Sequence, residues 1–233
     1  MSPHSPASPS RYKLRRVLAT FAALYPDPKT ELHHENPWQL LVATILSAQC
    51  TDRRVNLITP RIFARYPDAL ALSRVSQAEL EDLIRDCGLY RTKARNLLAT
   101  ARIVAEEYAN QVPQDPEALM RLPGVGRKTA NVVMANAFDR PALAVDTHVF
   151  RVSHRLGWAT GKTPEETERE LTALIPKRQW NRAHHWLILH GRRVCSARRP
   201  ACHQCAVAAW CPKVGVEPAS LPPSLVTSSA ARG

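Results

Sequence analysis

The sequence predicts an all-α fold, a packed array of eight to ten short helices. Helix start signals recur along the chain, as capping residues followed by proline or by an acidic residue three positions later. Runs of alternating β-branched residues between hairpin turns are missing from the sequence, and the strongest strand candidate, 142–145, is too short to found a sheet. With 233 residues, of which 45% are hydrophobic, the chain can build one large or two small cores.

Residues that start or stop helices bound each expected helix. The expected helices are 36–48, 76–88, 92–108, 115–122, 127–137, 146–157, one that begins at 163, and 180–190. Capping boxes are predicted at 76–79 and 163–166. Gly88 and Gly191 are expected to end the helices that precede them, because glycine favours the helix C-terminus.

Both ends of the chain are rich in Ser, Pro and Ala. Such composition buries little apolar surface. We therefore expect a disordered N-terminal extension over 1–11 and a flexible tail over 214–233.

The charge balance points to a polyanionic partner. The chain carries 32 Lys and Arg against 20 Asp and Glu, a formal net charge of +12. This favours nucleic acid over a membrane surface. No apolar run in the sequence approaches the roughly 20 residues that span a bilayer, and the N-terminus lacks the hydrophobic segment of a secretory signal. We expect an intracellular protein.

Two helices joined by a glycine-rich turn are predicted at 115–137. Gly124, Val125 and Gly126 lie in this turn, and Arg127 begins the second helix. Unpaired backbone N–H groups at a helix start attract phosphate, and glycines let the backbone approach it closely. The unit is predicted to bind DNA backbone without reading bases, although an ordinary helix connection is the alternative.

Lys128 and Asp146 form a candidate catalytic pair. A lysine amine can attack a sugar carbon and form a Schiff base, but only when neutral. Lowering the pKa of an amine by three units corresponds to about 4 kcal/mol, whereas a helix dipole supplies about 0.3–1 kcal/mol. Desolvation and the charge of Arg127 would have to supply the rest. The alternative is that Lys128 contacts phosphate and Asp146 only caps its helix.

Four of the six cysteines follow the spacing C-x6-C-x2-C-x5-C, namely Cys195, Cys202, Cys205 and Cys211. Four thiolates within seventeen positions can enclose a tetrahedral metal centre or a cubane iron–sulfur cluster. Zinc usually takes two closely paired knuckles, and a disulfide is the weaker alternative in an intracellular chain. Arg198 and Arg199 lie in the first loop, where a cluster would present them to phosphates.

These motifs together resemble the endonuclease III family of DNA glycosylases, within the helix-hairpin-helix superfamily. The resemblance covers about residues 12–212 and rests on the cysteine spacing and on LLVATILSAQCTD (40–52), GLYRTKARN (88–96), LPGVGRKTANVV (122–133), AVDTHVFRV (144–152) and HHWLILHGRRVC (184–195).

The resemblance implies two α-helical domains with a DNA-binding cleft between them. A six-helix domain would span 30–140 and contain the helix-hairpin-helix at 115–137. An iron–sulfur domain would join 12–29 to 141–213 and hold a 4Fe–4S cluster on the four cysteines. It further implies a monomer that acts on damaged double-stranded DNA in the cytoplasm, associated with the nucleoid.

The implied activity is base excision repair of oxidised pyrimidines in duplex DNA. Lys128 would attack C1′ of the damaged nucleotide. Asp146, eighteen residues later, would help to activate the lysine and stabilise positive charge on the sugar. The Schiff base would then permit β-elimination, which cleaves the strand at the abasic site.

Further residues match family positions that contact DNA. Gln49 would fill the gap left by an extruded base, and Leu89 would wedge into the opposing strand. Extrusion costs a few kcal/mol, so side chains that fill the gap are physically needed. His148 is expected to contact DNA, and Ser47 and Asp52 are expected to line the substrate pocket.

Alternatives within the superfamily are a pyrimidine-dimer glycosylase and an adenine-mismatch glycosylase. The mismatch enzyme typically lacks the hairpin lysine, whereas Lys128 is present here. A non-catalytic DNA-binding module is the alternative from another class. The sequence departs from the family at Cys50, where many relatives have alanine, and this change could alter the loop that carries Gln49.

Overall fold

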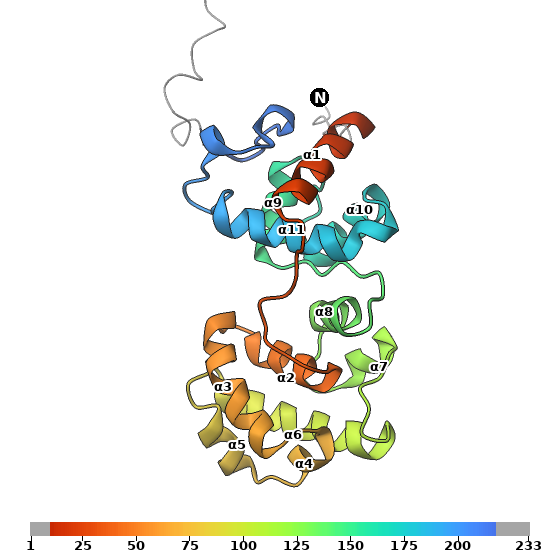
Figure 1. Cartoon of the computed structure of the whole chain (residues 1–233), viewed down its shortest axis with the longest axis vertical. Coiled ribbons are helices and arrows are strands. Elements are labelled where there is room, and N and C mark those ends of the chain that lie inside the picture. Colours follow the sequence, from red (N-terminus) through yellow and green to blue (C-terminus); the bar gives the residue numbers. More distant parts are fainter. Residues whose placement is uncertain (1–9, 218–233) are drawn as a thin grey trace, which may run out of the picture. The chain divides into compact units, whose positions relative to one another are not determined.

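The computed structural model describes residues 10–217, and within this range every regular element is helical, which confirms the all-α prediction (Figure 1). The elements are α1 (Arg11–Leu24), α2 (Pro37–Ser47), α3 (Asp52–Arg65), α4 (Ala69–Ser73), α5 (Gln77–Leu83), α6 (Tyr90–Glu107), α7 (Pro116–Arg121), α8 (Arg127–Ala137), α9 (Thr147–Arg155), α10 (Pro164–Leu174), α11 (Trp180–Arg193) and the short 3-10 helices η1 (Lys177–Gln179), η2 (Cys202–Gln204) and η3 (Ala208–Trp210).

The chain divides into two compact units. One comprises residues 29–144, and the other joins the N-terminal segment up to Pro28 to the residues from Val145 onward. The first unit therefore contains α2 to α8, and the second contains α1 together with α9 to α11 and the 3-10 helices. The second unit is assembled from both ends of the chain.

The core of the 29–144 unit is built around α2. Asn36 caps this helix, since its Oδ1 accepts a hydrogen bond from the N–H of Gln39 at 2.9 Å, and Pro37 occupies the first turn. Every residue from Trp38 to Leu46 is buried, and α2 contacts α3, α6 and α8. A helix that is apolar on all sides is stable only when others surround it, so α2 forms the centre of this unit.

The core of the second unit forms where α1 meets α11. Trp186 of α11 is fully buried, and its Nε1 donates a hydrogen bond to the carbonyl oxygen of Tyr25 at 3.0 Å. Phe21 of α1 is also fully buried. The bond satisfies the one polar atom of the indole, so the ring can be buried without an unpaired donor.

The structure shortens the helix that begins near Ser76. Helix α5 ends at Leu83, so the expectation that Gly88 ends it is wrong. The predicted capping box is half present, because Ser76 Oγ accepts from the Glu79 N–H at 3.2 Å, whereas the Glu79 carboxylate accepts a hydrogen bond from the Tyr66 hydroxyl. The capping box at 163–166 is complete.

Helix α11 continues past Gly191 to Arg193, so the expectation that this glycine ends the helix is also wrong. Gly191 packs against α9 instead. A Cβ added at this position would lie 3.0 Å from the Cβ of His148 and 3.2 Å from Nη2 of Arg151. Glycine is required here for the close approach of two helices and not for a turn.

Most of the two predicted tails lies outside the described residues. Helix α1 begins at Arg11 with Ser10 as its cap, and Val214 donates a backbone hydrogen bond to Arg155, so the described chain extends slightly into each predicted tail. Within residues 10–217, no helix has the length and apolar character needed to cross a bilayer.

Candidate functional site

The turn between α7 and α8 contains a glycine with left-handed backbone conformation. Gly124 has a φ of +80°, and a Cβ there would lie 3.1 Å from the Cβ of Asn96, so both conformation and space require glycine. Val125 is buried and anchors the turn, and its N–H donates to the carbonyl oxygen of Leu122 at 3.0 Å. Gly126 is exposed and directly precedes α8, to which it makes no side-chain cap bond.

The start of α8 is accessible to an anion. Gly126 offers no side chain to cap the first turn, and this turn contains no acidic residue. Arg127 and Lys128 are the first two residues of the helix, and both are exposed. The turn thus combines exposed backbone at the positive end of a helix with two cationic side chains.

Asp146 is the N-cap of α9. Its Oδ1 accepts hydrogen bonds from the N–H groups of His148 and Val149, each at 2.8 Å. Both cap bonds fall on one oxygen of the carboxylate, and the side chain is only half-buried. Lys128 belongs to the 29–144 unit and Asp146 to the other unit.

His148 is held by neighbouring residues in a neutral form. Nη2 of Arg151 lies 3.1 Å from its Nδ1, and because a guanidinium only donates, Nδ1 accepts and Nε2 carries the proton. Burial lowers the pKa of His148, and the nearby Asp146 charge opposes this shift. Arg151 also donates to the carbonyl oxygen of Gly191 at 3.0 Å, which ties α9 to α11.

Gln49 and Leu89 are brought together in the 29–144 unit. Gln49 follows α2 and Leu89 precedes α6, and both adopt the left-handed backbone region with φ values of +52° and +58°. Gln49 is exposed, and Leu89 is 59% exposed despite being apolar. The two loops touch, because a Cβ on Gly88 would lie 3.2 Å from the carbonyl oxygen of Gln49. Leu89 is therefore not part of the hydrophobic core.

The two predicted pocket residues flank the Gln49 loop. Ser47 is the last residue of α2, and its hydroxyl donates to the carbonyl oxygen of Thr44 at 2.8 Å. Asp52 is the first residue of α3, where Thr51 forms the cap. Both side chains are partly exposed beside Gln49.

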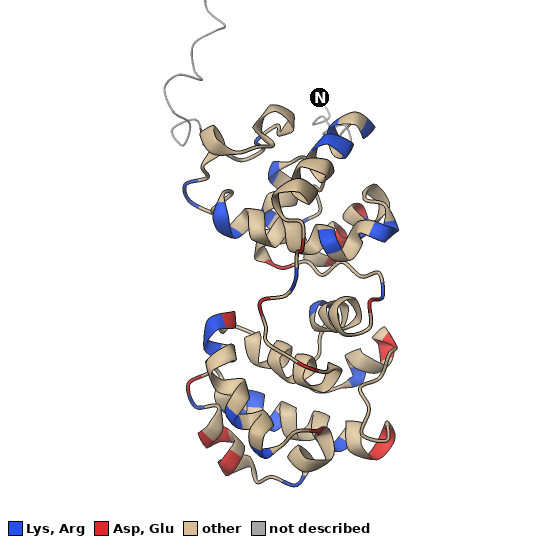
Figure 2. Ribbon diagram, viewed as in Figure 1, with Lys and Arg blue, Asp and Glu red and all other residues tan. Residues whose placement is uncertain are grey.

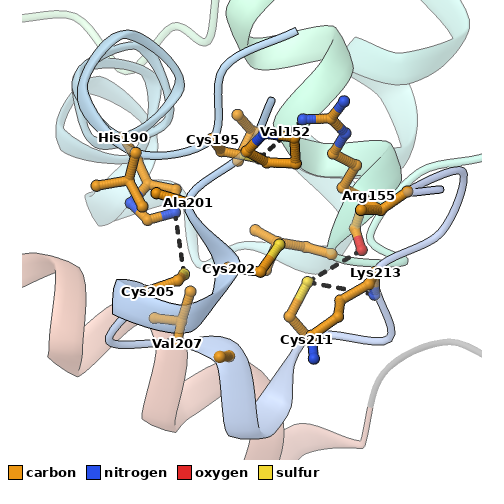
Figure 3. Close-up of a pocket in the computed structure, with 15 residues that line it drawn as sticks. Val152, Arg155, His190, Cys195, Ala201, Cys202, Cys205, Val207, Cys211 and Lys213 are labelled. Atoms are coloured by element: carbon orange, nitrogen blue, oxygen red, sulfur yellow. Dashed lines mark hydrogen bonds between the residues drawn. The ribbon is translucent and has the colours of Figure 1, made fainter. Parts of the chain in front are cut away.

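The four clustered cysteines line one pocket (Figure 3). They are Cys195, Cys202, Cys205 and Cys211. Polar groups face the sulfurs: His190 Nε2 lies 3.5 Å from Cys205 Sγ, and the Lys213 N–H donates to Cys211 Sγ at 3.4 Å. Within residues 10–217, no three His, Cys, Asp or Glu side chains are arranged to hold a metal ion.

Sequence reasoning missed Arg155, which organises this pocket. Its Nη1 donates to Cys195 Sγ at 3.3 Å and to the Ser196 carbonyl oxygen at 2.7 Å, and its Nη2 donates to the Ala197 carbonyl oxygen at 2.7 Å. Its own carbonyl oxygen lies 3.2 Å from Cys211 Sγ. A basic residue in the last turn of a helix normally indicates only a favourable dipole interaction, so the sequence carried no specific signal.

The loop between Cys195 and Cys202 presents two arginines to solvent. Arg198 and Arg199 are both exposed. The loop is closed by a backbone bond from Ala201 to Val194 at 2.9 Å. Figure 2 shows Lys and Arg on both units, and acidic residues are also found on both, for example in α5 and α10.

Comparisons with known proteins agree on one family. Residues 42–177 match the model of the HhH-GPD superfamily of base excision DNA repair proteins. Endonuclease III of Synechocystis is 48% identical over 203 residues, which cover 87% of this chain and 93% of that protein. Endonuclease III of Escherichia coli is 42% identical over 202 residues, 87% of this chain and 96% of the relative.

The fold agrees with solved structures of the same family. A trapped endonuclease III–DNA covalent intermediate matches with a TM-score of 0.83 and 45% identity, covering 88% of this chain and 96% of that one. A non-covalent endonuclease III–DNA complex matches equally well. The chain therefore belongs to the endonuclease III family, within the HhH-GPD superfamily of base excision DNA repair proteins.

Proposed function

We propose that this protein removes oxidised pyrimidines from duplex DNA and cleaves the resulting abasic site through a Schiff base on Lys128. Membership of the endonuclease III family makes it a bifunctional DNA glycosylase and abasic-site lyase of base excision repair. The observation that carries the proposed site is the exposed Lys128 in the uncapped first turn of α8, directly after the glycine turn.

The turn at 124–126 positions the DNA backbone. Its exposed glycines and the N-terminus of α8 bind a phosphate, and Arg127 adds a cation beside it. Binding at this point places the sugar of the damaged nucleotide within reach of Lys128, which is the next residue along the helix. The turn contacts backbone only, so the damaged base is selected elsewhere.

Lys128 performs the covalent chemistry. Its neutral amine attacks C1′, the N-glycosidic bond breaks, and the base leaves with a proton. The sugar ring then opens as the C1′–O4′ bond breaks and O4′ takes up a proton, which leaves a protonated imine between C1′ and Lys128. This imine draws electrons from the sugar, so that loss of a proton at C2′ breaks the bond between C3′ and its phosphate oxygen, and the phosphate leaves. Lys128 is exposed in the structure, so bound DNA has to supply the desolvation that favours a neutral amine.

Asp146 supports this reaction as a carboxylate. Its cap bonds use Oδ1 alone, so Oδ2 can stabilise positive charge on the sugar or accept the amine proton. The same cap bonds fix the orientation of the side chain. His148, whose backbone N–H donates one of them, is assigned a DNA contact as a neutral imidazole.

Gln49 and Leu89 are assigned to the space left by the extruded base. Their loops touch and present an amide and an exposed aliphatic side chain from one unit. Filling the gap offsets part of the few kcal/mol that unstacking costs. Ser47 and Asp52, which flank Gln49, are assigned to the pocket that receives the base.

The pocket of four cysteines suits a 4Fe–4S cluster. Four sulfurs and hydrogen-bond donors toward them line an otherwise largely apolar pocket. Each thiolate of a cubane binds a different iron, so the ligands need not converge on one ion, as they would for zinc. When bound, the cluster supplies a rigid cross-link of the loop that carries Arg198 and Arg199.

The nucleophile is tested by borohydride trapping on duplex DNA that contains an oxidised pyrimidine. Wild-type protein should give a covalent adduct, Lys128→Ala should give none, and the exposed Lys162→Ala serves as a matched control that traps normally. An undiminished adduct in Lys128→Ala would overturn the assignment of Lys128 as the nucleophile.

The substrate class is tested with a panel of oxidised, dimerised and mismatched bases. Selective action on pyrimidine dimers would replace oxidised pyrimidines as the proposed substrate. We assign the protein to the cytoplasm as a monomer associated with the nucleoid.

A further inference from the structure

Two cysteines outside the pocket of four cysteines face each other in the 29–144 unit. Cys50 Sγ and Cys87 Sγ lie 3.9 Å apart, although the residues are 37 positions apart in the sequence. Cys50 directly follows Gln49 and is partly exposed, whereas Cys87 precedes Leu89 by two residues and is 2% exposed. The pair therefore connects the two loops that carry the residues assigned to DNA insertion.

The surrounding backbone holds these loops in register. The Cys50 N–H donates to the Ser47 carbonyl oxygen at 3.1 Å, and the Cys87 N–H donates to the Ile84 carbonyl oxygen at 2.8 Å. Between the loops, Gly88 has no side chain, and a Cβ there would lie 3.2 Å from the carbonyl oxygen of Gln49. The thiols thus meet because the backbones of the two turns are in contact.

A buried lysine links the two helices that adjoin these loops. Lys93 of α6 is 4% exposed, and its Nζ donates to the carbonyl oxygen of Leu46 near the end of α2 at 2.8 Å. Charge-assisted bonds of this kind are among the stronger ones in proteins. The end of α2 and the start of α6 are therefore tied together, and these are the helices next to the two loops.

We propose that Cys50 and Cys87 form a reversible disulfide that links the Gln49 loop to the Leu89 loop. A disulfide has an S–S bond of about 2.05 Å, so the two sulfurs must approach by about 1.9 Å from their present 3.9 Å. Disulfides inside cells are usually transient and redox-sensing, so the proposed bond is reversible.

The oxidant is a small disulfide of the glutathione class. The partly exposed Cys50 attacks one of its sulfurs as a thiolate and expels the other as a thiol, which leaves a mixed disulfide on Cys50. Cys87 then loses its proton and attacks Cys50 Sγ, and the second small thiol leaves with a proton. Two cysteine thiols are oxidised and one small disulfide is reduced to two thiols.

The environment of the two thiols sets this order. Burial, followed by the nearby Cys50, raises the pKa of Cys87 to about 12, so Cys87 is a poor first nucleophile. Cys87 can nevertheless attack second, because the mixed disulfide forms on Cys50, directly beside it. A buried neighbouring thiol is suited to the second, resolving step.

The consequence for DNA rests on the proposed function. Gln49 and Leu89 both have left-handed backbone conformations, and a new covalent bond between Cys50 and Cys87, one and two residues away, would shift them. Misplacement of positioning groups by about 1 Å can cost on the order of a hundredfold in rate. We expect oxidised protein to excise bases about tenfold to a hundredfold more slowly, and a dithiol reductant to restore the rate.

The bond itself is tested on the full-length holoprotein incubated with glutathione disulfide, followed by alkylation and peptide mass spectrometry. The expected product is a cross-linked peptide pair that contains Cys50 and Cys87 and has lost both thiol hydrogens. Cys50→Ala and Cys87→Ala should each lack it. Recovery of both cysteines alkylated, or of Cys50 carrying only glutathione, overturns the inference whatever the activity.

The functional consequence is tested separately with Cys50→Ala as the matched control. Cys50→Ala should keep its rate after the same treatment, whereas the wild type slows, and the visible absorbance and iron content of both should stay unchanged. Equal slowing of both proteins would overturn the link between the disulfide and activity. If Gln49→Ala and Leu89→Ala excise bases normally, the assigned roles of these residues fail, while the cross-link result stands by itself.

Discussion

Gly191 lies so close to His148 that a Cβ on the glycine would sit 3.0 Å from the histidine Cβ and 3.1 Å from its Nδ1. Real Cβ atoms rarely tolerate such distances, and His148 is fixed by Arg151 and by the cap of α9. The absence of one side chain in α11 therefore sets the approach of two helices and the orientation of a residue assigned to DNA contact.

Replacing Gly191 by alanine should destabilise the protein. Alanine inside a helix stabilises the folded state by about 1 kcal/mol relative to glycine, but overpacking destabilises it by about 1–3 kcal/mol. We expect a net loss of up to about 2 kcal/mol in the free energy of unfolding, measured by urea denaturation. In Gly126→Ala a Cβ meets nothing within 4 Å, so this variant reports the cost of alanine at a helix N-cap without any overpacking. Equal stability of wild type and Gly191→Ala would contradict the packing argument.

The two roles of Asp146 can be separated by substitution. Asparagine also caps helices through Oδ1, so Asp146→Asn should change the unfolding free energy by no more than about 0.5 kcal/mol. Asp146→Ala loses the cap and should cost about 1 kcal/mol. Both variants should lose about a hundredfold or more in single-turnover excision, because both lack the carboxylate. Normal excision by Asp146→Asn would show that the residue acts only as a cap.

Stability should fall at mildly acidic pH because of His185. Burial, with a smaller contribution from the neighbouring His184, lowers the pKa of His185 to about 3, from about 6.5 in the unfolded chain. The folded state therefore binds fewer protons than the unfolded state. The contribution of neutral His185 to the free energy of unfolding is complete above pH ~6.5 and is lost as pH falls toward ~3. Between pH ~6.5 and ~5 the free energy of unfolding should fall by about 2 kcal/mol.

The measurement is urea denaturation of wild type and His185→Gln at several pH values. Glutamine does not titrate, so the variant should show a flatter dependence even though it starts from a lower stability. Carboxylates titrate in both proteins, and their effect cancels in the comparison. Parallel curves for the two proteins would exclude His185 as the cause.

Arg155 should control retention of the proposed cluster. Its guanidinium binds Cys195 Sγ and the carbonyl oxygens of Ser196 and Ala197, and a lysine cannot reproduce these three bonds. In the presence of a chelator, Arg155→Lys should lose iron several times faster than the wild type. The loss is measured as the decrease in visible absorbance. Arg198→Lys, an exposed change in the same loop, should lose iron at the wild-type rate. Identical loss from all three proteins would remove Arg155 from this role.

The sequence by itself determined the helical class, most helix starts, the glycine turn and the grouping of four cysteines. These features depend on neighbours within a few positions. Asn36, Asp115 and Asp146 cap their helices because a short polar side chain reaches the N–H groups two or three residues later. Gly124 was recognisable because two glycines flank one small apolar residue between two helix signals. Local rules of this kind need no knowledge of the remaining chain.

The tertiary structure alone decided the features that depend on residues far apart in sequence. Gly88 and Gly191 look like helix stops, but they serve close approaches to Gln49 and His148. The contact of Cys50 with Cys87 arises in the same way. No local pattern records which backbone will pass within van der Waals distance, because packing of whole helices sets those distances.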